Sequence, residues 1–331
     1  MLRSADEDTG TLRYYEYVSS EVDYAPTEHP YLSVFYVNSS GLESMWSYHS
    51  QSAGRAGSTY VNDYTGALTI VHDSVSVDGG ALPISISHVY NSNDRSTDVG
   101  FGKGWRLSIM EEVSAVTLNS TTWYCYLDGD GTKHYYYPSG TSGEYLDEMN
   151  SKNKLTVGSG SYTLENSSFI TRTYDSTGRL ISISDPNGNT QTITYDGSRP
   201  VYVTDSAGRT ATLYYGSSRL ATIQYPDGSQ ATCYYTDDGQ LSQIRDADGN
   251  FGYYAYFTDS MVLVDPQGYQ LWFYFDTSTW RVKSIESITQ GTNIEGPSLS
   301  IEYGWNVTSY TDNQGRTELV RFNNQGEPVS V

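Results

Sequence analysis

Residues of the types that bind calcium occur together in Asp128-Gly129-Asp130-Gly131. An EF-hand loop that began at Asp128 would need a bidentate glutamate at its twelfth position, and Ser139 occupies that position. Asp-Gly pairs between segments rich in aromatic residues are also typical of tight hairpin turns. We therefore expect a turn here and no metal site.

Histidines and paired acids are further candidates for catalysis. His72, His88 and His134 lie next to no G-x-S-x-G nucleophile motif, so we expect each of them to fill a strand position. Asp237-Asp238 and Glu111-Glu112 have the composition of a glycosidase acid and base, but that chemistry needs one carboxyl group in an apolar pocket, and these pairs fall at expected turns and strand ends. The sequence indicates no enzyme and no cofactor.

A glycine-rich segment runs from Gly100 to Gly104 and contains Lys103. No Ser or Thr follows the lysine and no helix is expected after it, so the segment predicts no phosphate-binding loop. Its glycines permit close backbone approach beside Trp105, which we expect to be a buried anchor. Cys125 and Cys233 lack metal-ligand spacing, and we expect two packed thiols.

The elements that carry these residues follow a period of about twenty, which is typical of repeat architectures. The first unit contains Tyr174, Asp175, Gly178, Arg179, Leu180, Asp185 and Gly188, and Tyr195 opens the next unit. The turn glycines Gly188, Gly208, Gly228, Gly249 and Gly268 follow at intervals of 20, 20, 21 and 19 residues. Each unit has two turn signals and two short segments of β-forming residues, so it predicts a β-hairpin.

Alternation along these segments predicts one apolar and one polar face, because residues two apart in a strand share a face. The position before each Asp turn is held by Ile183, Val203, Ile223 and Ile244. Two residues earlier, and expected on the same face, stand Ile181, Val201 and Ala221. The return strands place threonines on the opposite face, which we expect to be polar.

A single hairpin is marginally stable in water, so the hairpins must pair laterally. We predict an all-β protein in which the hairpins form one long, continuous antiparallel strip. Tyrosine, with 32 residues against 8 Phe and 6 Trp, suits such strands, and no window has a helical apolar stripe.

Charge excludes several classes of partner. The formal net charge is −20, the isoelectric point is about 4.4 and the mean hydropathy is −0.52. Binding to nucleic acid or anionic lipid depends on clustered Lys and Arg, which are absent. No run of 18 apolar residues offers a membrane-spanning segment.

The repeat motif resembles the YD repeats of RHS proteins, a family that includes bacterial RHS toxins, wall-associated RHS proteins, shell components of insecticidal toxin complexes and animal teneurins. The resemblance lies in Gly178-Arg179-Leu180 and in Asp185-Pro186-Asn187-Gly188-Asn189-Thr190. Upstream, Tyr60 to Gly66, Leu82 to Ser92 and Gly100 to Leu107 look like the segment that opens the RHS region.

The resemblance implies three parts. Residues 1–40 are expected to be the tail of a preceding β-sandwich module, partly disordered. Residues 41–160 are expected to be the opening segment of the RHS region, and residues 161–331 the YD/RHS repeats, truncated at the C-terminus.

The resemblance also implies a function: a non-enzymatic segment of a β-shell that encloses or presents a C-terminal effector polypeptide, often a toxin in related proteins. The expected partners are that effector or neighbouring RHS repeats of a longer parent chain. The family resemblance implies a secreted or cell-surface location, although this chain has no signal peptide.

A cell-surface carbohydrate-binding or adhesion module is the alternative. Tyrosine rings can stack on the sugar rings of a cell-wall or host glycan. The candidates are Tyr214, Tyr215, Tyr234, Tyr235, Tyr253 and Tyr254. Tyrosines on a sheet also serve in cross-strand packing, which is the structural alternative for the same residues.

Overall fold

The computed structural model describes residues 40–77, 82–148, 152–289 and 295–330, and within these ranges the protein is built of β-strands. The only helical turns among them are the 3₁₀ segments η1 (Gly54–Ala56) and η2 (Ser92–Asp94). The described residues include no helix that is long and apolar enough to cross a membrane. The predicted tail of a preceding module, residues 1–40, lies outside the described residues except for Ser40.

The smaller of two sheets is formed by five antiparallel strands in chain order. These strands are β1 (Tyr48–Ser52), β2 (Ser58–Asn62), β3 (Leu68–Ser76), β4 (Ser85–Asn91) and β5 (Trp105–Leu107). Three of their apolar side chains, Leu68, Ile70 and Ile86, are fully buried.

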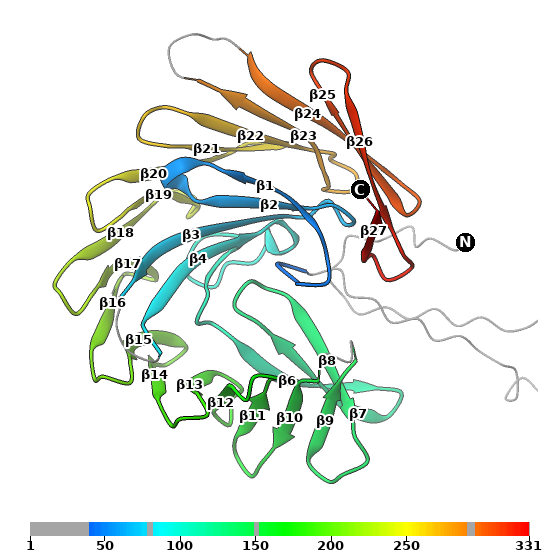
Figure 1. Ribbon diagram of the computed structural model, residues 1–331. Helices are drawn as coiled ribbons and strands as arrows, with labels where there is room; N and C mark the ends of the chain where they lie inside the picture. Colours follow the sequence, from blue (N-terminus) through cyan, green and yellow to red (C-terminus); the bar gives the residue numbers. More distant parts are fainter. Residues whose placement is uncertain (1–39, 78–81, 149–151, 290–294, 331) are drawn as a thin grey trace, which may run out of the picture.

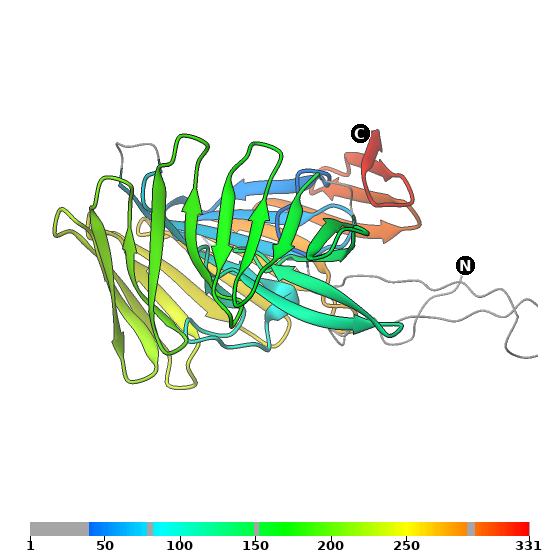
Figure 2. The same cartoon turned by 90° about the horizontal axis from the view of Figure 1, so that it is seen from below.

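The larger sheet contains the remaining strands, and each of them pairs antiparallel with the next along the chain. Its strands are β6 (Glu112–Leu118), β7 (Thr121–Leu127), β8 (Lys133–Pro138), β9 (Glu144–Asp147), β10 (Lys154–Val157), β11 (Tyr162–Glu165), β12 (Thr171–Tyr174), β13 (Leu180–Ser184), β14 (Thr190–Asp196), β15 (Arg199–Thr204), β16 (Thr210–Gly216), β17 (Arg219–Gln224), β18 (Gln230–Tyr235), β19 (Leu241–Arg245), β20 (Phe251–Tyr256), β21 (Ser260–Val264), β22 (Gln270–Phe275), β23 (Val282–Ile288), β24 (Glu295–Gly304), β25 (Val307–Asp312), β26 (Thr317–Phe322) and β27 (Pro328–Ser330). This arrangement confirms the predicted all-β strip of laterally paired hairpins. Figure 2 shows the strands of the repeats side by side, with their turns along two rims.

The larger sheet closes on itself where β6 meets the start of β13. Glu112 forms a β-bridge with Arg179, and the flanking bonds run from Val113 N to Gly178 O (2.8 Å) and from Leu180 N to Glu111 O (3.2 Å). Strands β6 to β13 therefore form a ring. From β13 onward the sheet continues as an arc around the smaller sheet, as Figure 1 shows.

Gly178 is required at this closure. It has φ +89°, and a Cβ atom placed on it would lie 1.9 Å from Val113 O. Any side chain would push β6 away from the repeat, so the glycine of the Gly-Arg-Leu motif has a steric role here as well as a conformational one.

The smaller sheet corrects the expectation of one continuous sheet. Its apolar residues and the inward residues of the repeats form a single core, which includes Ile70, Ile86, Ile223 and Leu263. A strip of hairpins with one apolar face needs another surface to cover that face, and the opening segment supplies it as a separate sheet.

The register of the repeats corrects a second expectation. Tyr215 lies opposite Leu220 whereas Tyr214 lies opposite Thr222, so Ala221 is an extra residue in a β-bulge. The same shift makes Ile181 and Val201 extra residues in their hairpins. The bulge breaks the alternation of two, and the prediction that these three residues share the apolar face was wrong.

We call Ile183, Val203, Ile223 and Ile244, which precede the Asp turns, the Asp-turn set. The residues on the inner face of the bulged strands lie three positions before the members of this set. They are Leu180, Pro200, Leu220 and Leu241, all buried. Of the Asp-turn set, Val203, Ile223 and Ile244 are fully buried, and Ile183 is half-buried and packs against the core. A strict alternation would have exposed every one of these leucines.

Candidate functional site

The six candidate sugar-stacking tyrosines lie on both faces of the larger sheet. Tyr214 and Tyr234 are 49% and 40% exposed on the outer face. Their neighbours Tyr215 and Tyr235 are half-buried and pack against the core, since successive strand residues face opposite sides. In β20, Tyr254 is buried and its hydroxyl donates to Ala56 O (3.0 Å), while Tyr253 is half-buried on the other face.

An aromatic row, which the sequence analysis only partly identified, extends along the outer face. Its members are Tyr214, Tyr234, Phe251, Tyr253, Trp272 and Tyr274. Ring centroids are 6.1 Å apart for Tyr234 and Phe251, and 5.7 Å for Phe251 and Tyr253. Trp272 and Tyr274 stack at 6.0 Å. The signal that could have revealed the missed residues is the spacing of two in Phe251-Gly252-Tyr253 and Trp272-Phe273-Tyr274.

The inward tyrosines of the motif have structural roles. The guanidinium group of each motif arginine lies over a tyrosine of the next hairpin, with Arg179 at 4.9 Å from the Tyr195 ring and Arg199 at 5.4 Å from the Tyr215 ring. The Tyr215 hydroxyl donates to Pro200 O (2.8 Å), beside the bulge. The motif residues therefore join neighbouring hairpins.

A cleft of roughly 560 Å³ lies beside the repeat that contains Arg199 and Pro200. The opening segment makes backbone hydrogen bonds to the repeats on either side of this one. Leu180 N donates to Glu111 O on one side and Leu220 N donates to Gly100 O (3.2 Å) on the other, but Pro200 between them has no N–H. Three arginines, Arg179, Arg199 and Arg219, line the cleft together with Asp98, Glu111 and Glu112. Arg219 forms an ion pair with Asp98 (2.7 Å), so the charges are largely compensated within the protein.

Cys233 and His88 lie in contact, with Sγ 3.3 Å from Nε2, and His88 Nδ1 is 2.6 Å from Ser74 Oγ. A thiol beside an imidazole is the arrangement of a nucleophile and its base. Activation requires a lowered thiol pKa and a protonatable base, but burial raises the pKa of Cys233 to about 12 and lowers the pKa of His88 to about 3. The pair is a neutral hydrogen-bonded contact between the two sheets, consistent with the expected packed thiol and strand histidine.

Trp105 is 1% exposed, as expected of a buried anchor, and its Nε1 donates to the Tyr256 hydroxyl (2.7 Å). It also packs edge-on against Tyr254, with centroids 4.8 Å apart. The residue links β5 of the smaller sheet to β20 of the larger one.

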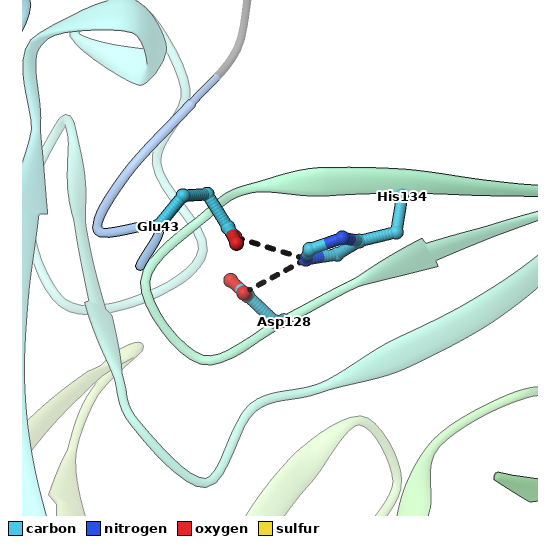
Figure 3. Close-up of side chains that lie close together, drawn as sticks. All are labelled: Glu43, Asp128 and His134. Atoms are coloured by element: carbon cyan, nitrogen blue, oxygen red, sulfur yellow. Dashed lines mark hydrogen bonds and ion pairs between the residues drawn. The ribbon is translucent and has the colours of Figure 1, made fainter. Parts of the chain in front are cut away.

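Glu43, Asp128 and His134 form a cluster whose donor atoms all lie within 4.8 Å of one another (Figure 3). His134 Nε2 is 3.2 Å from Glu43 Oε1 and 3.2 Å from Asp128 Oδ2. The side chains are only 16% (His134), 21% (Glu43) and 18% (Asp128) exposed. Burial alone would lower the pKa of His134, but its hydrogen bonds with Asp128 and Glu43 and the charges of these two residues raise that pKa to about 10.

The expected hairpin turn holds two members of this cluster. Asp128 N donates to Thr132 O (3.0 Å) and Gly131 N to Asp128 O (3.2 Å), which confirms the turn between β7 and β8. Glu43 comes from the segment before β1, far away in the sequence. No local pattern pairs it with this hairpin, so sequence analysis missed it.

Comparisons with known proteins support the interpretation of the repeats. Residues 174–201 match the family model described as RHS Repeat, and residues 59–136 match a model described as a domain of unknown function, DUF6531. Among curated proteins, none matches the sequence.

Several solved structures are similar to parts of the chain. The first is the crystal structure of TcdB2-TccC3-Cdc42, with 10% sequence identity and a TM-score of 0.31. The match covers 82% of the present chain and 18% of the TcdB2-TccC3-Cdc42 chain. Over 62% it is similar to the TCP10 domain of Danio rerio CPAP in complex with a peptide of Danio rerio STIL, at 14% identity and a TM-score of 0.19, spanning 97% of that chain. Over 67% it is similar to a porin-like protein from Bacteroides uniformis, at 13% identity and a TM-score of 0.25, spanning 91% of that chain. Likenesses at this level carry no functional argument.

The family therefore rests on the repeats themselves. Residues 174–201 combine the twenty-residue period, the hairpin with its bulge and the match to RHS Repeat. The chain therefore contains an RHS repeat at residues 174–201.

Proposed function

We propose that this chain is a non-enzymatic structural segment of a β-shell that encloses or presents a C-terminal effector polypeptide. The observation that carries the proposal is the larger sheet, in which strands β6 to β27 follow one another in chain order. A sheet with this topology extends by adding hairpins at its end, and its curvature makes it a wall. The expected partners are the effector and neighbouring RHS repeats of a longer parent chain, in a secreted or cell-surface protein.

The groups that could perform chemistry support a structural role. Among the described residues, the Cys233–His88 pair is buried with pKa values shifted away from activation. The carboxylate of Glu111, which is 8% exposed, accepts hydrogen bonds from the hydroxyls of Tyr126 (2.9 Å) and Tyr174 (2.8 Å). These hydrogen bonds tie the carboxylate into the ring of β6 to β13.

The test uses the product of the complete reading frame, purified intact and treated with protease. We expect any segment downstream of residue 331 to be cut slowly in the folded protein and rapidly when it is expressed alone. Equal cleavage rates in the two forms, or a reading frame with no further segment, would overturn the enclosure of an effector.

Glycan binding is a second candidate function, and the aromatic row favours it. Tyr214 and Tyr234 are exposed and the other rings of the row are half-buried, and such rings offer the flat apolar surface on which sugars stack. On a glycan array, the double variant Tyr214→Ala/Tyr234→Ala should lose binding. Tyr137→Ala, which removes a tyrosine that is 38% exposed in β8, outside the row, should retain it. Absence of binding by the parent protein would remove this candidate.

A further inference from the structure

We propose that Glu43, Asp128 and His134 form a Zn²⁺ site that clamps the segment before β1 onto the β7–β8 hairpin. This site is independent of the proposed shell function. It differs from the sequence-based expectation that the Asp128 turn holds no metal.

The geometry of the three side chains suits a small tetrahedral ion. Zinc binds nitrogen and oxygen at about 2.0–2.2 Å, so two neighbouring tetrahedral ligands lie about 3.3–3.5 Å apart. His134 Nε2 is 3.2 Å from one oxygen of each carboxylate, and all three donor atoms lie within 4.8 Å of one another. Figure 3 shows both carboxylates directed at the same ring nitrogen.

Each ligand is held in place by its surroundings. The second carboxylate oxygen of Asp128, Oδ1, accepts from Asp130 N (3.0 Å) and Thr132 N (2.9 Å), which leaves Oδ2 directed at the cluster. The Tyr126 ring stacks on the His134 imidazole, with centroids 5.4 Å apart and planes at 23°. Side chains that are already ordered lose little conformational entropy when they bind an ion.

The segment that carries Glu43 is fastened to the same hairpin. Gly41 N donates to Thr132 Oγ1 (2.7 Å), and Leu42 N donates to Asp130 Oδ2 (2.9 Å). Glu43 N donates to the Tyr48 hydroxyl (2.6 Å). These backbone hydrogen bonds therefore hold the Glu43 carboxylate next to the β7–β8 hairpin.

The donor set selects the metal. One imidazole and two carboxylates suit Zn²⁺, which accepts nitrogen ligands and four-fold coordination, with water in the fourth position. Ca²⁺ prefers six to eight oxygen ligands, which this cluster does not offer. The two carboxylates also neutralise the charge of the zinc ion. On binding, the ion takes the place of the proton between the imidazole and the carboxylates.

The ion would add a cross-link between parts of the chain 85 residues apart, from Glu43 to Asp128. Protein stability should therefore rise with zinc by mass action, because the unfolded chain does not hold the three ligands together. The role is structural, as expected for a site that joins the lead-in to the smaller sheet with the first hairpins of the larger one.

The experiment uses the chelator-treated chain and ZnCl₂, with calorimetric titration and thermal unfolding. We expect one Zn²⁺ per chain and a higher Tm. Glu43→Gln and His134→Gln should each weaken binding more than about tenfold, the scale of losses when metal-site residues are replaced. Glu144→Gln, at a half-buried acid paired with Lys154 (3.7 Å), is the matched control and should bind as the parent does.

Two results would overturn the proposal: no stoichiometric binding by the parent, or undiminished binding by His134→Gln, which would indicate an adventitious ion only. If either ligand variant fails to fold, X-ray absorption of the zinc-loaded parent decides instead. A shell with imidazole scattering and oxygen ligands supports the site, and a shell without imidazole rejects it.

Discussion

The repeats and the opening segment stabilise the same core in different ways. In the repeats, hydrogen bonds join neighbouring hairpins, such as that from Tyr215 to Pro200, 15 residues apart. The opening segment makes contacts that span most of the chain: Trp105 reaches Tyr256, 151 residues away, and Thr308 donates to Asp63 O, 245 residues away. The repeats thus form most of the larger sheet, while the opening segment makes the long-range contacts and covers the apolar inner face of that sheet.

The largest effect that would sharpen this comparison is expected from Trp105→Ala. The indole is fully buried between the two sheets, so its removal should lower the free energy of unfolding by about 3–5 kcal/mol. Trp272→Ala, in the outer aromatic row, should cost clearly less. Denaturant unfolding of both variants measures the difference, and equal losses would mean that the smaller sheet does not anchor the larger one.

The next effect is expected from Gly178→Ala, which tests the closure. Its Cβ would meet Val113 O, and the backbone has a positive φ, so we expect a loss of about 3 kcal/mol or more. Gly188→Ala is the matched control, because its φ is +84° with nothing within 4 Å of the added atom. It should cost only about 1 kcal/mol. If both variants unfold at the same denaturant concentration, the contact between β6 and β13 contributes nothing.

A smaller effect separates the two faces of one strand. Tyr215→Phe removes the hydroxyl that donates to Pro200 O and should lower the free energy of unfolding by about 1 kcal/mol. Tyr214→Phe changes the adjacent, exposed residue and should be nearly neutral. Thermal unfolding of the two single variants is sufficient, and a neutral Tyr215→Phe would remove the proposed role of the motif tyrosine.

The smallest effect is acid sensitivity of a repeat turn. Burial raises the pKa of Asp175, but the hydrogen bonds from Thr177 and Arg179 together outweigh this effect and lower the pKa to about 2. A carboxyl group with a pKa lowered on folding stabilises the protein above its unfolded value and loses this effect as pH falls toward the folded value. Stability of the parent should therefore fall from about pH 4 to about pH 2 more than that of Asp175→Asn. Parallel pH profiles would show that the turn contributes nothing to acid sensitivity.

The sequence allowed the hairpins to be predicted because their signals are local. Asp185 and Gly188 lie in one turn, where Asp185 Oδ1 accepts from the backbone N–H groups of Asn187 and Asn189 (both 2.9 Å). The bulges could not be predicted, because Ile181 and Val201 look like any other β-branched strand residues. A bulge depends on the partner strand, and an alternation pattern contains no information about that partner.

Of the candidate sites, the aromatic row was predicted in part from the sequence, and the proposed zinc site was not predicted. Tyr214 and Tyr234 were predicted and are exposed, but Tyr215 and Tyr235 lie on the other face. Asp128 and His134 belong to one hairpin. Glu43 lies 85 residues before Asp128, and no rule of residue spacing pairs it with that hairpin. The predicted domain boundaries at residues 40 and 160 stay predictions.

By itself the sequence determined an all-β chain of paired hairpins, because period, turn chemistry and strand composition act over a few residues. Only the tertiary structure decided that a second sheet fills the arc, that β6 closes onto Gly178 and that Glu43 meets His134. These contacts depend on which distant surfaces remain apolar or charged after the local strands have formed, and chain order does not specify that.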